Sequence, residues 1–600
     1  MRLLVCLKNM TRKYKTDWNL RKLFYTSIKD PKIENDMKKS DRATEAFATK
    51  YRADKSWLKE PKALAKALTA YERLYVESSS APILYASYRK ELNADDKQAE
   101  ALMNKLDERY TKNGNKLVFF MLELAKVPVS VQKRFLKSPE LAKYNYFLKK
   151  LFENAKHDLS EKEEKILSLM SDVSHGRWVQ AVENIVHTAE VSFGGKLIPV
   201  SEAIEKLRML PKTKRHALHV SIMKVLRDIA PMAESELNAI IARKKITDEL
   251  RGFEEPFDAT IIGYENERKS VLAMVEAVSE RFDIARRFYK TKAGLMGEKK
   301  LTYADRGARI GVIKKKISFE QATNIVRDAF YALHPRYAEI FERLLLNSQV
   351  DVYPKKGKSG GAFCSGAVSS PTMVLLNHVD DANSLMTLAH EMGHAIHTER
   401  SKKQQPMYQD YSTAVAETAS TFFEQVAFDA LTDLLSEKER LIVAHDHLQD
   451  DVATIFRQIA LFNFERDLHN AVRSTGLVPK EEIAKLMNKH MSSYLGKSVS
   501  LTEDDGYFFV YWSHIRRFFY VYSYAYGKII SRALYARVKK DASYIEKVDA
   551  FLSAGGSASP EDIFATCGLD VRSQDFFKEG LMDIENDLVE LEHSAKKRKK

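Results

Sequence analysis

The sequence predicts a mainly α fold that contains one small β-sheet. Glycine and proline make up only 23 and 15 of the 600 residues, about half of their usual share, so residues that form turns are scarce. Apolar residues recur at helical spacing over long stretches. Only the region 349–377 alternates small and β-prone residues as strands do. A chain of this length with 44% hydrophobic residues can bury a large core.

The N-terminal third is expected to be helical. From residue 18 to about residue 107 apolar side chains follow helical spacing, and the same pattern continues to residue 151. Ser160 with Glu163 three residues later is typical of a capped helix start. We therefore predict an N-terminal helical region over 1–110 and a second helical domain over 111–190.

The rest of the chain is expected to form the largest domain. A Gly-Gly pair followed by a proline interrupts the helical pattern near 191–200, and helices are expected again over 201–288 and 319–346. A further helix is expected from about 411 to 434, and a last helical pair ends near Glu592. We predict a domain over 191–592, followed by a basic tail over 593–600.

Composition limits the cellular setting and the partners. Three widely spaced cysteines, Cys6, Cys364 and Cys567, argue against a disulfide framework and fit a reducing cytoplasm. The apolar run 3–7 is too short for an export signal or a membrane span. The net charge of +14 comes from interleaved basic and acidic residues and from the final run 596–600. A solvated tail explains that run, so we expect no nucleic-acid or membrane partner. A cytoplasmic location is expected, and the oligomeric state is left open with a monomer favoured.

The segment from His390 to His394 reads His-Glu-Met-Gly-His and has the pattern of a zinc site. In a helix, residues four apart project from one face, so His390 and His394 can bind the same ion. Glu391 is rotated by about 100° from His390, and it is placed to act as a general base. The helix is expected to begin near 381–384, with an apolar stripe on its buried side.

A catalytic zinc ion usually takes a third protein ligand. His397 lies two turns from His390, about 10 Å along the axis, so we interpret it as an outer or packing histidine. Gly at 397 and His at 400, which a metzincin requires, are absent. Small residues around Glu417 would let a second helix approach, so Glu417 is the candidate ligand. Glu424, two turns on, is predicted to orient a ligand histidine; an ordinary surface glutamate is the alternative at both positions.

Four segments together resemble the M3 metallopeptidases, specifically the oligoendopeptidase F branch. They are His390–His397, the Ala-Glu-Thr-Ala-Ser-Thr-Phe block around Glu417, the loop Gly361–Cys364, and Phe519–Tyr524. The resemblance covers most of the chain. It implies a zincin-like multi-helical clamshell around a deep substrate channel, with one zinc ion held by His390, His394 and Glu417. It also implies that 111–190 is an oligopeptidase F N-terminal-type domain and 191–592 the zinc metallopeptidase catalytic domain.

The same resemblance assigns roles in the C-terminal part. It implies that His514 and Tyr520 assist the transition state, and phenols are suitable neutral donors near pH 7. Arg516 and Arg517 replace a usual aromatic residue or proline in this block. An aromatic core helix is the alternative, above all for Tyr522.

The loop Gly360, Gly361, Ala362 and Phe363 is predicted to offer its backbone to a peptide laid alongside as an extra strand, with Tyr524 as a further substrate contact. A phosphate-binding loop at 355–359 is the rival interpretation. The Gly-Lys-Ser/Thr ending of such loops does not follow, so nucleotide binding is disfavoured.

The resemblance implies endopeptidase action on short, unstructured peptides, and the His-Glu-x-x-His pattern predicts Glu391 as general base toward zinc-activated water. An exopeptidase on the same scaffold, carboxypeptidase-like or dipeptidase-like, is the nearest alternative. A non-catalytic, basic helical protein that binds nucleic acid is a more distant one, because a structural zinc site needs four protein ligands and only three are found.

Overall fold

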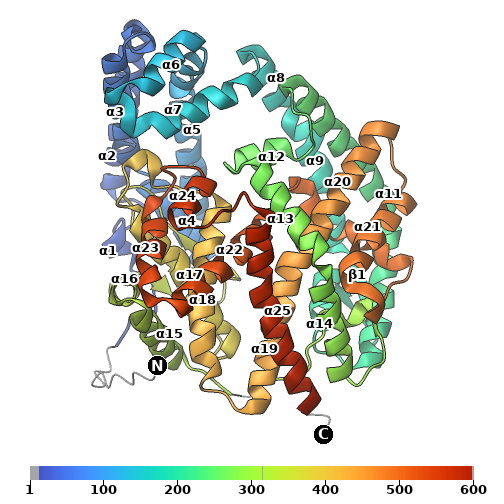
Figure 1. Ribbon diagram of the computed structural model, residues 1–600. Helices are drawn as coiled ribbons and strands as arrows, with labels where there is room; N and C mark the ends of the chain where they lie inside the picture. The colour runs from blue at the N-terminus through green and yellow to red at the C-terminus, as the bar shows by residue number, and fades with distance from the viewer. Residues whose placement is uncertain (1–12, 314, 598–600) are drawn as a thin grey trace. The chain divides into compact units, whose positions relative to one another are not determined.

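The computed structural model describes residues 13–313 and 315–597. The N-terminal apolar run 3–7 and Cys6 lie outside these residues. The described chain is mainly α with small sheets, as predicted, and it divides into two compact units (Figure 1). The first unit combines the described residues up to Asn145 with Lys315–Asp410 and Val426–Ala430. The second combines Tyr146–Lys314, Tyr411–Gln425 and the described residues from Leu431 onward.

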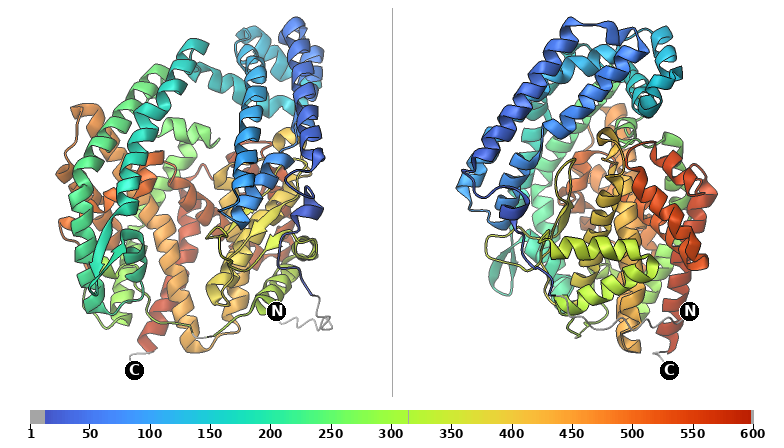
Figure 2. Two further views of the ribbon diagram at one scale, coloured as in Figure 1. Left: turned by 180° about the vertical axis from the view of Figure 1, so that it is seen from behind. Right: turned by 90° about the vertical axis from the view of Figure 1, so that its left-hand side faces the viewer.

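The first unit contains a helical group, a three-stranded sheet and three further helices. Its helices are α1 (Leu20–Leu23), α2 (Pro31–Ala53), η1 (Ser56–Leu58), α3 (Pro61–Glu77), α4 (Ala81–Leu92), α5 (Lys97–Ala125), α6 (Val129–Lys137), η2 (Pro139–Tyr144), α15 (Phe319–Leu333), α16 (Pro335–Leu346), α17 (Ala382–Ser401) and η6 (Pro406–Tyr408). Its strands are β4 (Val350–Asp351), β5 (Phe363–Ser365) and β6 (Met373–Leu375). The long helices α2, α3 and α5 contact one another and appear in blue in Figure 2.

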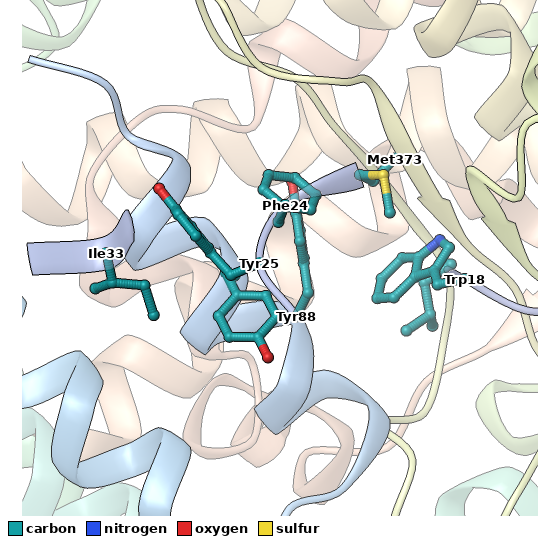
Figure 3. Close-up of a cluster of buried hydrophobic side chains, with 8 residues drawn as sticks. Trp18, Phe24, Tyr25, Ile33, Tyr88 and Met373 are labelled. Carbon is teal, nitrogen blue, oxygen red and sulfur yellow. The ribbon is translucent and has the colours of Figure 1, made fainter. Parts of the chain in front are cut away.

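The small sheet has the order β4-β6-β5, with β4 parallel and β5 antiparallel to the central strand. It lies within the region 349–377, where strands were predicted. The N-terminal segment is fastened to it by Trp18, whose indole nitrogen Nε1 donates hydrogen bonds to the carbonyls of Gln349 (3.0 Å) and Val374 (2.9 Å). Trp18 belongs to a buried cluster with Phe24, Tyr25, Ile33, Tyr85, Tyr88, Met373 and Leu375 (Figure 3).

The second unit is built from helices of very different lengths. They are α7 (Asn145–Asn154), η3 (Ala155–His157), α8 (Glu161–Ser171), η4 (Asp172–Gly176), α9 (Arg177–Thr188), α10 (Val200–Lys206), α11 (Lys212–Arg251), α12 (Asp258–Gly263), α13 (Arg268–Glu280), α14 (Phe282–Leu295), η5 (Tyr303–Asp305), α18 (Thr413–Thr432), α19 (Glu437–Asp451), η7 (Val452–Phe456), α20 (Arg457–Thr475), α21 (Lys480–Leu495), η8 (Gly496–Ser498), η9 (Asp504–Val510), η10 (Ser513–Arg517), α22 (Tyr522–Lys540), η11 (Ala542–Tyr544), α23 (Ile545–Ala554), α24 (Pro560–Thr566) and α25 (Gln574–Lys597). Its strands are β1 (Glu190–Phe193), β2 (Lys196–Pro199), β3 (Leu301–Thr302) and β7 (Val499–Ser500).

Local sequence explains several element ends in this unit. Ser160 and Glu163 form the predicted capping box at the start of α8. The interruption near 191–200 is a β-hairpin of β1 and β2, in which Gly194 and Gly195 adopt positive φ angles at the turn. The last helix continues to Lys597, so the first half of the expected basic tail is helical. Residues 598–600 lie outside the description.

Helix α22 lies in the core of the second unit and packs against α25. Helix α25 also packs against α19 (Figure 1). Arg532 of α22 is 2% exposed and forms ion pairs with Asp451, Asp583 and Asp587. Charges this deeply buried need partners, so the carboxylates of α19 and α25 fix the facing side of α22. None of the helices in the described ranges combines the length and apolar character that crossing a membrane requires.

Candidate active site

Helix α17 carries the first two candidate ligands. Asp381 caps it by accepting a hydrogen bond from the Ser384 backbone N–H at 2.8 Å. The imidazole rings of His390 and His394 lie one turn apart, with centroids separated by 5.0 Å and planes at 83°. The predicted apolar stripe Leu385, Leu388, Met392 and Ile396 is completely buried. Burial of this stripe turns the two histidines toward the opposite side of the helix.

The electrostatics of α17 favour a neutral second histidine. Burial, together with the charge of His390, lowers the pKa of His394 to about 3. A neutral imidazole has a free lone pair, which is the form that binds metal ions. His394 therefore has the protonation state that binding of a cation requires.

Glu417 of α18 completes a metal-binding group. Each of His390, His394 and Glu417 offers one ligand atom, and the three atoms all lie within 4.8 Å of one another. Two imidazoles with one carboxylate form a donor set known for catalytic zinc. The residues therefore fit the predicted ion.

Glycine on a neighbouring helix supports the position of Glu417. A Cβ atom at Gly527 of α22 would lie 2.9 Å from the Glu417 Cβ and 3.2 Å from the Thr418 backbone nitrogen. The hydroxyl of Thr421 also donates to the Glu417 carbonyl at 2.6 Å. Only a residue without a side chain lets α22 approach α18 this closely. The sequence analysis missed Gly527, because its signal appears only when the facing helix is known.

Glu391, the candidate general base, is 7% exposed. Its charge acts on Cys364 of strand β5. Burial and the charge of Glu391 together raise the pKa of the Cys364 thiol. Buried carboxylates act strongly on nearby charges, since little water screens them. The catalytic role of Glu391 stays a prediction.

His397 and Glu424 have environments that fit supporting roles. His397 is fully buried, and burial with the charge of His394 lowers its pKa to about 3. The charge of Glu424 acts on Lys528 of α22. Burial by itself lowers the pKa of Lys528, but the negative charges of Glu424 and Asp451 outweigh burial and raise this pKa. The proposed contact of Glu424 with a ligand histidine stays a prediction.

His514 and Tyr520 are brought together in a segment that is not a continuous helix. His514 lies in η10 and Tyr520 just before α22, and the His514 Nδ1 atom is hydrogen-bonded to the Tyr520 hydroxyl. Burial and the charges of Arg457 and Arg517 lower the pKa of His514. The imidazole is consequently neutral near pH 7.

Neighbouring aromatic residues divide into two kinds. The Tyr524 ring lies 5.8 Å from the Tyr520 ring and 6.2 Å from the His514 ring, so it belongs to the same aromatic group. Tyr522 is fully buried, and its hydroxyl donates to the Asn266 side chain at 3.0 Å. For Tyr522 the structure agrees with the alternative of a core residue.

Arg516, one of the two departures from the expected pattern, is also structural. Its guanidinium donates two hydrogen bonds to the carboxylate of Glu236, at 2.7 and 2.8 Å, and both side chains are almost fully buried. Arg517, in contrast, is exposed. The ion pair between Arg516 and Glu236 joins η10 to α11, 280 residues away in sequence.

The predicted substrate loop leads into an edge strand. Gly360 and Gly361 precede β5, and the Asn377 amide donates to the carbonyls of Ser359 (2.9 Å) and Gly361 (2.8 Å). Phe363 pairs with Leu375, and its ring lies 6.3 Å from the Trp18 ring. The Phe363 side chain is thus used in packing.

Two family profiles match this chain. Peptidase family M3 matches residues 242–583, and the profile described as Oligopeptidase F matches residues 123–184. The chain belongs to peptidase family M3. The domain boundaries of this M3 peptidase at 110, 190 and 592 stay predictions, although both matches fall inside the expected domains.

Known proteins resemble the M3 peptidase over nearly its whole length. Group B oligopeptidase PepB of Streptococcus agalactiae is 26% identical over 545 residues, which cover 86% of this chain and 87% of that protein. A solved structure from Chlamydophila abortus, assigned as a peptidase, has a TM-score of 0.81 at 20% identity and covers 92% and 96% of the two chains. Oligoendopeptidase-F of Enterococcus faecium has a TM-score of 0.67 at 17% identity, with coverage of 94% and 98%.

These findings confirm the predicted enzyme class, a metallopeptidase of the oligoendopeptidase F branch that hydrolyses peptide bonds. The likeness to the solved structures supports the mainly α fold. The clamshell and channel stay predictions, as do the individual site residues.

Proposed function

We propose that this chain is a zinc-dependent endopeptidase that cuts internal bonds of short, unstructured oligopeptides. The observation that carries the proposal is the convergence of His390, His394 and Glu417 in a member of peptidase family M3. The name oligoendopeptidase-F of the Enterococcus relative favours internal cleavage of small peptides.

Glu391 would act first as the general base and then as the general acid of the reaction. A bound zinc ion would supply Lewis acidity, which can lower the pKa of water to about 7. Glu391 accepts one proton from the attacking water as its oxygen bonds to the scissile carbonyl carbon. The same carboxyl group then delivers that proton to the leaving amine nitrogen as the C–N bond breaks.

His514 and Tyr520 would stabilise the oxyanion that forms at the carbonyl. A neutral imidazole and a phenol carry one polar hydrogen each, and the contact between them uses one. Whichever residue donates in that contact, the other hydrogen remains free for the substrate oxygen. The pair thus offers one neutral hydrogen-bond donor, which can stabilise a developing negative charge.

The edge strand β5 offers a way to orient the peptide. In the order β4-β6-β5, one side of β5 faces away from its partner strand in the described sheet. An extended peptide can pair with such an edge through backbone hydrogen bonds, which do not depend on its sequence. The segment Gly360–Phe363 leads directly into this edge.

The proposal is tested first by Glu391→Gln. We expect zinc content to stay at one ion per chain and kcat on a quenched fluorescent peptide to fall about 10²-fold or more, because the amide cannot accept the proton. Glu399→Gln is the matched control on the same helix, since Glu399 bonds to Lys402 and Thr372 instead. Equal activity of Glu391→Gln and wild type would refute the role of Glu391.

A peptide library blocked at both ends separates the alternatives. Internal cuts that disappear with a chelator and return with zinc support the endopeptidase. If only peptides with free ends are cut, one residue or dipeptide at a time, the exopeptidase alternative is correct. Salt-sensitive nucleic-acid binding without any chelator-sensitive cleavage would favour the non-catalytic alternative.

A further inference from the structure

The backbone immediately before Tyr520 adopts an uncommon conformation. Phe518 has φ 49° and Phe519 has φ 57°, in the left-handed region that residues with a Cβ atom seldom enter. Two such residues in succession are costly, so the surrounding structure must hold them in place. Their geometry sets the direction in which Tyr520 leaves η10 toward α22.

Side chains from two helices hold this turn. The backbone N–H of Phe519 donates a 2.7 Å hydrogen bond to the Glu465 carboxyl of α20, and the Thr260 hydroxyl of α12 donates to the Phe518 carbonyl at 3.0 Å. Glu465 is 0% exposed. A backbone N–H buried at a turn needs an acceptor, and no carbonyl of a regular helix serves Phe519.

Among the described residues, Glu465 forms no ion pair with a lysine or an arginine. The nearest basic atom in the described chain is Nε2 of His469, at 3.9 Å. Burial lowers the pKa of His469 well below its usual value and raises the pKa of Glu465 well above its usual value, which disfavours the charged form of each group. The charge of Lys244 acts to lower the pKa of Glu465, but the Lys244 ammonium is itself hydrogen-bonded to Asp248 at 2.8 Å. The hydrogen bond from Phe519 is therefore the main polar contact of this buried acid.

We propose that Glu465 is a positioning residue for the pair His514 and Tyr520. By accepting the Phe519 N–H, it keeps the left-handed turn that directs the Tyr520 hydroxyl to His514 Nδ1. The inference rests on the proposed function, in which that pair binds the oxyanion. It goes further by assigning the geometry of the pair to a residue that contacts neither substrate nor metal.

Glu561 provides a matched control. It is also 0% exposed, and one of its oxygens accepts a backbone N–H, that of Glu267 at 2.9 Å, together with the Asn266 amide at 3.0 Å. Both glutamates have a second oxygen without a hydrogen-bond partner in the described chain. They differ in the backbone segment that they hold, because Glu465 accepts the N–H of Phe519 next to Tyr520, whereas Glu561 accepts the N–H of Glu267.

The test compares Glu465→Met, Glu465→Gln and Glu561→Met as zinc-loaded full chains. We expect Glu465→Met to lower kcat about 10- to 100-fold through misplacement of the pair, with KM within about twofold and zinc content unchanged. Amide hydrogen exchange in residues 513–521 should accelerate. In Glu465→Gln, kcat and the exchange rate of residues 513–521 should lie within about threefold of the wild-type values, because the amide oxygen accepts the same N–H. Glu561→Met should reduce stability only.

A double variant checks that Glu465 acts through Tyr520. Tyr520→Phe should cost little further activity in the Glu465→Met background, because residues acting as one unit are not additive. If Glu465→Met fails to fold, Thr260→Val removes the second anchor, and we expect the same pattern with a smaller loss. That substitution keeps size and shape while removing the hydroxyl.

Three results would overturn the inference: unchanged kcat and exchange in Glu465→Met, full additivity with Tyr520→Phe, or an equal kcat loss in Glu561→Met. Failure of the proposed function looks different. In that case Tyr520→Phe alone keeps the wild-type kcat, while hydrogen exchange in 513–521 still reports whether Glu465 holds the turn.

Discussion

The two halves of the candidate site are built in opposite ways. On α17 the placement of the candidate ligands His390 and His394 follows from the regular geometry of a helix whose apolar side is buried. Between η10 and α22, in contrast, His514 and Tyr520 meet only because Phe518 and Phe519 leave regular geometry. The regular half depends on local periodicity, whereas the irregular half depends on partners distant in the chain, such as Glu236 and Glu465.

The largest expected effect concerns the regular half. Glu417→Ala should remove the third ligand, so zinc is lost during dialysis and cleavage falls below detection, as measured by elemental analysis and peptide assay. Glu424→Ala is the comparison, with an expected weakening of about 10- to 100-fold in zinc affinity, as is usual for residues that support ligands. Full zinc content in Glu417→Ala would assign the third ligand to another carboxylate.

A smaller effect is expected from the strain in the irregular half. Phe518→Gly and Phe518→Ala both remove the ring, but only glycine adopts a positive φ angle without penalty. The glycine variant should thus be more stable than the alanine variant by about 1 kcal/mol in the free energy of unfolding. Chemical denaturation measures this difference. Equal stabilities would mean that the turn carries no strain at Phe518.

The smallest effect concerns the protonation of His514. The Arg457 charge contributes to lowering the pKa of His514, so Arg457→Met should raise that pKa toward its usual value. Protonation of His514 would then begin at higher pH, and the acid limb of the profile of kcat/KM should move upward in pH. Arg466→Met, whose charge acts on His490 instead, should leave the limb in place. A shift toward lower pH in Arg457→Met would contradict the assignment.

The same contrast explains what sequence could predict. The start of α17, its buried stripe, the small sheet and the capping box of α8 follow from local patterns, and the structure contains each of them. The hairpin of β1 and β2 was read only as an interruption, because its strands are short and largely exposed. The helical spacing of Phe519, Tyr520 and Tyr524 was the basis of the alternative of an aromatic core helix. In the structure Phe519 lies in the left-handed turn and helix α22 begins only at Tyr522.

Residues whose role depends on a distant partner were the hardest to predict. Arg516 was noted as a departure from the expected pattern, but its buried pairing with Glu236 spans 280 residues. Gly527 gains its meaning from the position of Glu417 on another helix. Neither relation leaves a periodic signal in the sequence, since each depends on which elements pack together.

The anchoring of Trp18 in the small sheet has a consequence for biosynthesis. Its indole bonds to the Val374 carbonyl across 356 residues of chain. At about 5–20 residues per second, a ribosome needs roughly 20–70 s after making Trp18 before that carbonyl exists. During this time the aromatic side chains of the N-terminal segment lack their partners on β6 (Figure 3). A nascent chain therefore exposes apolar surface to chaperones and proteases for far longer than a local helix takes to form.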